Sequence, residues 1–136
     1  MLENPKVNIK IKLATLWASA TFCYLYGDYF ELYTPDKVNS LITGDNVMDT
    51  PATLLLASIV LAIPSVMVAA SILLNSKINR ILNIIFGTIF TIMQVLIGIY
   101  STHEWYLFYV FLAFLESIIT ALVVWYAWKW PKKILN

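Results

Sequence analysis

Three acidic residues lie within long apolar stretches of this sequence. Asp28 and Glu31 occur in the first stretch and Glu116 in the last, and none of these stretches contains a Lys or Arg partner. An ionisable side chain in hydrocarbon is costly, so such residues face a bundle interior, water or one another. Carboxylates without a buried base can bind a cation or exchange protons. They can also hold an amine, and in the protonated form a carboxyl group can protonate an alkene.

The helical spacing places further polar residues beside these acids. Tyr24, Asp28 and Glu31 recur at three- and four-residue intervals, so they share one face of a helix. At about 1.5 Å per residue, Gln94 is expected level with Asp28, and Glu116 close to the membrane midplane. One polar pocket open to the outside is therefore expected, with these five residues binding a ligand or ion. Its lining is expected to include Trp17, Thr21, Thr91, Tyr109, Ser117 and Thr120.

The same residues also admit a purely structural interpretation. A carboxyl group in a helical bundle can bond to Tyr, Ser or Gln and act as structural glue. Glu31 can be a solvated interface residue, and the Ser, Thr and Gly stripes can serve close helix packing.

The composition defines the class of protein that must position these residues. Of 136 residues, 60% are hydrophobic and 12% are charged, whereas soluble domains are nearer half apolar and a quarter charged. This excludes a soluble enzyme, a disordered chain and a disulfide-stapled domain. A net charge of +1 provides no basic field for nucleic acid. We expect an integral membrane protein with a single domain over residues 1–136.

Four apolar segments are long enough to span a bilayer, at about 13–33, 51–74, 81–100 and 105–128. The expected fold is therefore all-α, a four-transmembrane-helix bundle. Asp49-Thr50-Pro51 caps the second helix, and Pro64 is expected to kink it. Residues 34–44 predict a short amphipathic helix on the outer membrane surface, in the first outer loop. The short turn at 75–79 predicts an antiparallel hairpin.

The basic residues predict the orientation of the bundle. Eight of the nine lie in the two terminal flanks and the second loop, and the other side has only Lys37. Because basic residues favour the cytoplasmic side, both termini should be cytoplasmic. Tryptophans at the ends of the last segment match the aromatic belt of a membrane span.

The sequence lacks the residues and motifs that metal binding, cysteine redox chemistry, phosphate binding and hydrolysis require. Cys23 and His103 are the only residues of their types, so no metal site, cofactor or redox cysteine pair is expected. Neither a phosphate-binding glycine loop nor a hydrolase or metalloprotease motif is present. No catalytic residue is therefore assigned.

Several stretches resemble a family of small bacterial four-span membrane proteins of unknown function. They are LWAS at 16–19, YGDYFELY at 26–33, KINR at 77–80, NIIFG at 83–87, and Glu116-Ser117 through WYAWK at 125–129. The resemblance implies a four-span fold in the bacterial inner (plasma) membrane, and it implies no activity.

The leading hypothesis is a transport or channel protein for a cation or protons, acting through Asp28 and Glu116. Four short helices leave little room for a pathway, so a homo-oligomer in the lipid bilayer is expected. Two alternatives remain: an intramembrane receptor or enzyme for a lipophilic ligand (amine, sterol-like or quinone-like), and an accessory subunit of a larger membrane complex.

Overall fold

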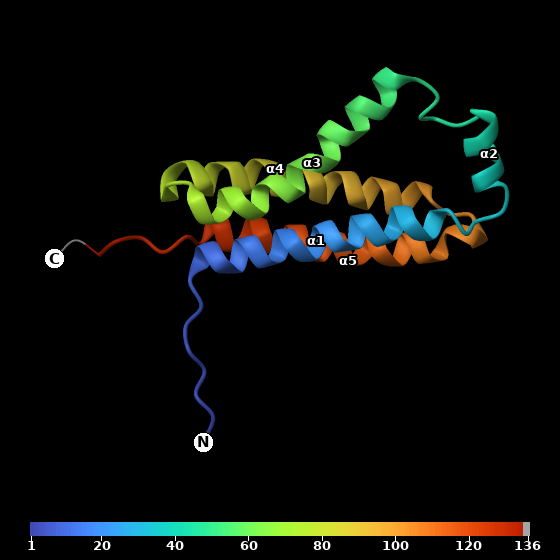
Figure 1. The fold of residues 1–136 in the computed structure, drawn as a ribbon. Helices are drawn as coiled ribbons and strands as arrows, with labels where there is room; N and C mark the ends of the chain where they lie inside the picture. The colour runs from blue at the N-terminus through green and yellow to red at the C-terminus, as the bar shows by residue number, and fades with distance from the viewer. Residues whose placement is uncertain (135–136) are drawn as a thin grey trace.

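A computed structural model describes residues 1–134, and their regular structure is all helical. The long helices are α1 (Ile9–Glu31), α3 (Pro51–Leu73), α4 (Ser76–Tyr100) and α5 (Leu107–Trp128) (Figure 1). A short helix, α2 (Lys37–Thr43), lies between α1 and α3, and a 3-10 turn, η1 (Glu104–Tyr106), precedes α5. The expectation of an all-α chain is confirmed.

Three helical segments among these residues are long and apolar enough to cross a membrane. They are Pro51–Leu73, Ser76–Tyr100 and Glu104–Trp128. Helix α1 is as long as α3, but its centre carries Thr, Ser, Tyr and Trp where the other helices carry mainly Leu, Ile and Val. The mean hydropathy of α1 is therefore lower than that of the other long helices, and α1 is not among the three candidate spans.

The helix ends follow the local sequence signals. Thr50 caps α3, because its Oγ1 accepts a hydrogen bond from the Thr53 backbone N at 3.2 Å, and Pro51 occupies the first turn. Gly44, with a φ of 76°, ends α2 in the left-handed conformation. The short helix expected between residues 34 and 44 is therefore present.

The turn between α3 and α4 is tighter than the sequence indicated. Asn75 is the N-cap of α4, and its Oδ1 accepts a hydrogen bond from the Ile78 backbone N at 3.2 Å. Helix α4 therefore begins at Ser76, and the expected start near residue 81 was wrong. Asn79 lies inside the helix and not in the loop.

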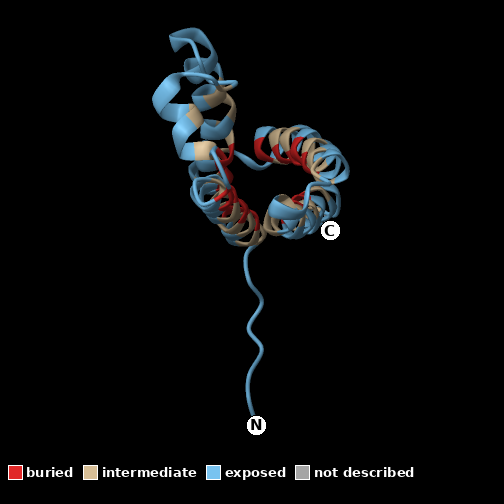
Figure 2. Cartoon of the chain, turned by 90° about the vertical axis from the view of Figure 1, so that its right-hand side faces the viewer, coloured by how far each residue is buried: buried red, intermediate tan, exposed pale blue. Residues whose placement is uncertain are grey.

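The four long helices form an open ring in the order α3, α1, α5, α4. Helix α5 packs on both α1 and α4, α1 also packs on α3, and the contact between α3 and α4 is small. Buried residues line the inner faces of the ring (Figure 2). The half of α3 before Pro64 leans away from the bundle, while the half after it packs against α1 (Figure 1). The sequence predicted a bend at this proline.

A buried polar network joins α1, α3 and α4 at the end of the bundle that carries both termini. Trp17 Nε1 donates to Asn83 Oδ1 at 2.7 Å, and both side chains are fully buried. Asn83 Nδ2 donates to Asn79 Oδ1 at 2.7 Å and lies 3.3 Å from Ser71 Oγ. Asn79 Nδ2 donates to the Ser71 carbonyl at 2.6 Å. One buried amide therefore connects three helices.

At the same end of the bundle, two basic side chains donate hydrogen bonds to the C-terminal carbonyls of α3 and α5. Lys10 Nζ donates to the Leu74 carbonyl at 2.7 Å, at the end of α3. Arg80 Nε donates to the Ala127 carbonyl at 3.1 Å, and its Nη2 to that of Trp128 at 3.3 Å. Cations at a helix C-terminus satisfy free carbonyls and complement the helix dipole.

Replacement of Asn83 by alanine should destabilise the bundle. The change leaves the Trp17 indole N–H and the Asn79 Oδ1 without partners, at a cost of about 1–3 kcal/mol for each unsatisfied group. Unfolding of the detergent-solubilised protein by SDS titration measures the loss. Asn39→Ala, on the exposed surface of α2, should change stability by less than about 0.5 kcal/mol. Equal stability of the two variants would contradict the importance of the network.

Two glycines of α4 should respond differently to alanine. A Cβ at Gly87 would lie 2.8 Å from Val124 Cγ2 and 3.3 Å from Val123 Cγ1, and valine side chains in helices have little rotamer freedom. We expect Gly87→Ala to lower stability by about 1–3 kcal/mol through overpacking. A Cβ at Gly98 would make an ordinary 3.6 Å contact with Ala113, so Gly98→Ala should be neutral or stabilising. The same unfolding titration compares them, and equal losses would contradict the close α4–α5 approach.

Candidate functional site

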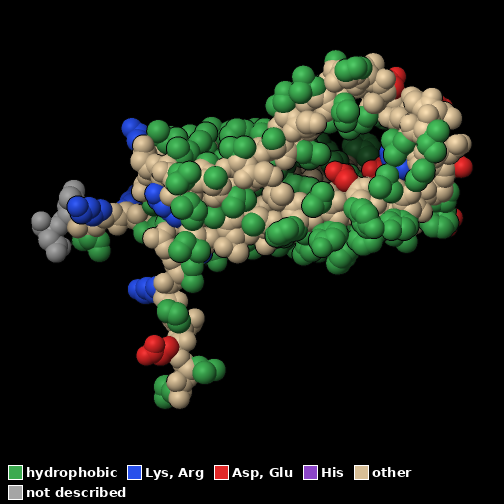
Figure 3. All heavy atoms as spheres, viewed as in Figure 1, with side chains coloured by type: hydrophobic (Ala, Val, Ile, Leu, Met, Phe, Trp, Pro, Cys, Tyr) green, Lys and Arg blue, Asp and Glu red, His purple; other side chains and the backbone are tan. Residues whose placement is uncertain are grey.

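A cavity of about 710 Å³ lies at the end of the bundle opposite the chain termini. It forms where the first half of α3 departs from α1 and α4, and α2 with the following linker closes part of it. Acidic and basic atoms are visible inside the hollow in Figure 3. Every helix contributes to its wall: Tyr24, Gly27, Asp28 and Glu31 from α1, Lys37 and Leu41 from α2, Leu56, Val60 and Leu61 from α3, Met93, Gln94 and Ile97 from α4, and Tyr109, Leu112 and Glu116 from α5.

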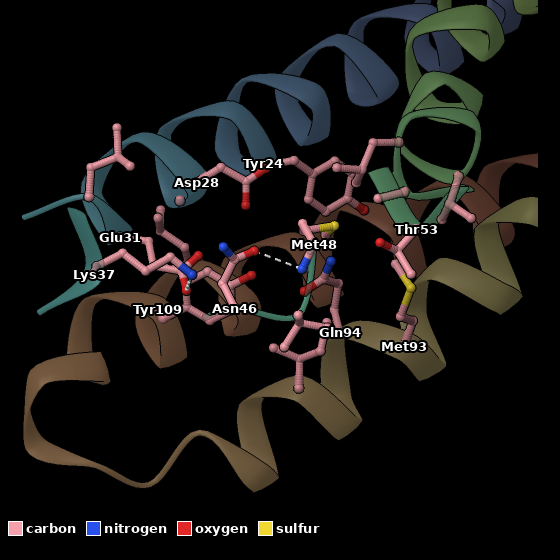
Figure 4. A pocket seen from close by; sticks show the side chains of 18 of the residues that line it. Tyr24, Asp28, Glu31, Lys37, Asn46, Met48, Thr53, Met93, Gln94 and Tyr109 are labelled. Atoms are coloured by element: carbon pink, nitrogen blue, oxygen red, sulfur yellow. Dashed lines mark hydrogen bonds and ion pairs between the residues drawn. The ribbon is translucent and has the colours of Figure 1, made fainter. Parts of the chain in front are cut away.

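The structure brings together all five residues predicted to bind a ligand or ion. Tyr24, Asp28 and Glu31 lie on the cavity-facing side of α1, as their spacing predicted (Figure 4). Gln94 and Glu116 reach the same cavity from α4 and α5, with exposed fractions of only 5% and 4%. Tyr109, one of the predicted lining residues, also lies on its wall.

The other predicted lining residues lie outside this cavity. Trp17 is in the core beneath it, bonded to Asn83, and Thr21 Oγ1 donates to the Trp17 carbonyl at 2.8 Å. Thr120 is fully buried and accepts a hydrogen bond from Thr91 Oγ1 at 2.8 Å. The helix faces that line the cavity continue beyond it into the packed core. Residues on the same face of a helix therefore do not all reach the cavity.

Thr91 and Ser117 line a different feature, a shallow groove of about 480 Å³ between α4 and α5. Its wall is almost entirely apolar, and Gln94 lies on both this groove and the main cavity. Ser117 Oγ donates to the Ala113 carbonyl at 2.7 Å, so its hydroxyl is already satisfied within the helix.

The acids of the cavity differ in their partners. Lys37 Nζ forms an ion pair with Glu31 Oε1 at 3.0 Å, and Tyr106 Oη donates to the same oxygen at 3.4 Å. The apolar stretches themselves contain no basic partner for Glu31, and this one comes from outside them, because α2 places Lys37 over the end of α1. Within residues 1–134, Asp28 and Glu116 form no ion pair.

The Tyr24 hydroxyl is buried without a partner. The side chain is 8% exposed, lies on the cavity wall, and its Oη has no hydrogen bond to any group in residues 1–134. A buried polar group without a partner is costly, and most such groups in proteins bond to protein, water or ligand. The hydroxyl of this cavity-lining residue is therefore a buried polar group whose hydrogen-bonding capacity no described residue satisfies.

The linker after α2 contributes residues that the sequence did not assign to the site. Asn46 Nδ2 donates to the Ser40 carbonyl at 3.2 Å, and its Oδ1 accepts from the Met48 backbone N at 2.8 Å. These bonds fold the linker so that Asn46 and Met48 face the cavity (Figure 4). The apolar stripe of α2 was the sequence signal that could have indicated a contribution to the site. The sequence analysis attributed this stripe to contact with the membrane surface. One of its residues, Leu41, instead lies on the cavity wall.

The acids of the described residues do not form a metal-binding group. No cluster of three or more His, Cys, Asp or Glu side chains is close enough to hold a metal ion in residues 1–134. The cavity instead combines separate carboxylates, two amides and two tyrosines with a largely apolar wall.

The fold and site thus define a small helical bundle with three span-length apolar helices and a cavity lined by three carboxyl groups, of which Glu116 is buried, Glu31 half-buried and Asp28 exposed. The chain belongs to a family of unknown function, DUF6326, whose model matches residues 4–136. The membership in a family of unknown function expected from the sequence is confirmed. No curated protein matches the chain. No solved structure matches it either.

The ion pair between Lys37 and Glu31 should hold α2 over the cavity more than it stabilises the whole fold. Both side chains are about a quarter exposed, and pairs of this kind contribute about 1 kcal/mol or less. We expect Lys37→Met to leave global unfolding within about 1 kcal/mol of wild type. Amide hydrogen exchange in residues 37–48 should rise by up to about fivefold. Lys132→Met, in the exposed tail, should leave exchange in this segment unchanged. Unaltered exchange in both variants would contradict a tethering role.

Proposed function

We propose that this protein is a four-span integral membrane protein that binds and transports a cation or protons through Asp28 and Glu116. The observation that carries the proposal is that two carboxyl groups without a basic partner share one cavity between the helices. Glu116 is only 4% exposed, and a carboxylate removed from water in this way requires a cation or a proton to balance its charge. Reversible exchange of that cation or proton is the elementary step of such transport.

Helix α1 is the fourth span in this proposal. Its 23 residues extend about 34 Å, close to the thickness of the hydrocarbon core. Its charged residues lie near its two ends, with Lys10 and Lys12 at the start and Asp28 and Glu31 at the finish. Its buried face packs on α3 and α5, and both of these are span-length helices.

In the proposed orientation the protein lies in a bacterial inner (plasma) membrane with both termini on the cytoplasmic side. The segment before α1 and the segment after α5 lie at one end of the bundle in Figure 1, and Lys and Arg side chains gather at that end in Figure 3. The excess of basic residues there supports a cytoplasmic side. The cavity then faces the outer side, with α2 above it.

A homo-oligomer is part of the proposal. The first half of α3 has large apolar side chains that no other helix covers, including Leu54, Leu55 and Ile59. The ring of helices is open at this side (Figure 2). A second copy in the bilayer would close it and complete a pathway past Glu116.

Substitution of the two carboxyl groups tests the transport function. Asp28→Asn and Glu116→Gln remove the negative charge at nearly constant volume, so each should reduce flux at least about tenfold. The measurement is the change of internal pH in proteoliposomes under an imposed gradient of Na⁺, K⁺ or an alkylammonium ion.

Glu104→Gln is the matched control, because Glu104 is an acid in η1 that does not line the cavity. Its flux should equal that of wild type. Size-exclusion profiles and unfolding titrations of all three variants establish that they are folded. Wild-type flux in both folded cavity variants would refute the proposed function.

A further inference from the structure

The size of the cavity is the first indication of its occupant. At about 710 Å³ it is far larger than a bare inorganic cation. It falls within the range of roughly 300–1,000 Å³ that is typical of sites for small organic molecules.

The wall of the cavity has a polar side and an apolar side. Asp28 and Glu116 come from α1 and α5, whereas α3 presents Leu56, Val60 and Leu61. Met93 and Ile97 of α4 extend the apolar side. A small hydrated ion would leave these side chains in contact with water, while an apolar group of a ligand would cover them.

Two aromatic rings and an unpartnered hydroxyl accompany the carboxyl groups. Tyr24 and Tyr109 line the cavity from α1 and α5, and tyrosine faces attract ammonium groups. The Tyr24 Oη has no bond within residues 1–134, and its residue is more than nine-tenths buried. A hydroxyl oxygen can accept a hydrogen bond from an ammonium N–H.

The opening of the cavity adds an independent argument. The hollow seen in Figure 3 lies between α1 and the arch formed by α2 and the first half of α3. In the proposed membrane-spanning bundle, the part of this opening between α1 and the first half of α3 would face lipid chains, and the part below α2 would face the outer side. Amphiphilic molecules concentrate in lipid, whereas inorganic cations are excluded from it.

We propose that the cation bound in this cavity is an amphiphilic organic amine. Its ammonium group lies between Asp28 and Glu116 and donates to Tyr24 Oη, and its apolar body lies along α3 and α4. This assignment rests on the proposed function and specifies the substrate class of that site. It also accounts for the absence of a metal-type cluster of ligands among the described residues.

The test measures binding to the full-length protein in phosphatidylcholine nanodiscs. Decylammonium is the probe, decanol is the neutral analogue of the same length, and ammonium and K⁺ are the cations without a tail. Intrinsic tyrosine and tryptophan fluorescence gives the dissociation constants, with empty nanodiscs correcting for partition into lipid. The variants are Glu116→Gln, Asp28→Asn and Tyr24→Phe, and Glu104→Gln is the control.

Decylammonium should bind saturably to wild type and to Glu104→Gln, and decanol at least about tenfold more weakly. Glu116→Gln and Asp28→Asn should each weaken decylammonium binding about tenfold or more. Tyr24→Phe retains the ring and loses the unpartnered hydroxyl. Its binding should weaken about fivefold while its melting temperature stays at or above that of wild type, a combination that a purely structural role would not produce.

Two results would overturn the assignment without affecting the transport function. Equal affinity for decanol and decylammonium would show that the carboxyl groups do not recognise the ligand. Carboxylate-dependent binding of K⁺ or ammonium that decylammonium cannot displace would identify an inorganic site. Absence of binding by every probe, together with wild-type flux in the cavity variants, would remove both proposals.

Discussion

The hydrogen bonds of Asn83 are the constraint on which the arrangement of the helices depends. This side chain is fully buried and contacts Trp17 of α1, Ser71 of α3 and Asn79 of its own helix. An amide in an apolar setting is stable only when its polar atoms are bonded, so the network fixes how these helices meet. The helices are held firmly at one end. Beyond the bend at Pro64, the first half of α3 diverges from the bundle and leaves room for the cavity.

The two ends of the bundle use polar groups in opposite ways. Near the termini, the buried amides and hydroxyls are bonded to one another, and Lys10 and Arg80 bind helix carbonyls. In the cavity, the Tyr24 hydroxyl and the carboxyl groups of Asp28 and Glu116 are left without protein partners within residues 1–134. Polar groups that stabilise the fold are thus separated from those available for binding. This separation favours a site that can gain or lose an occupant without disturbing the core.

Much of the fold and part of the site follow from sequence. Apolar length and capping residues located the long helices and α2, and three- and four-residue spacing found the cavity face of α1. The contribution of Lys37 could not be derived, because it depends on the direction in which α2 turns back. Asn79 and Asn83 were missed as a network, since Asn79 was assigned to a loop and polarity alone does not distinguish a buried amide from an exposed one. Trp17 and Thr120 show the limit of helical phase, which does not report depth along the helix.

The contacts of Lys10 and Arg80 have a consequence for biogenesis. In the proposed orientation these residues belong to the charges that retain a flank in the cytoplasm during insertion. In the folded bundle the same two side chains bind the C-terminal carbonyls of α3 and α5. In this orientation, the same charged side chains direct membrane insertion and later form hydrogen bonds between helices. In that orientation, inverting one hairpin after assembly would require breaking these bonds and carrying the cations through hydrocarbon, which would lock the topology kinetically.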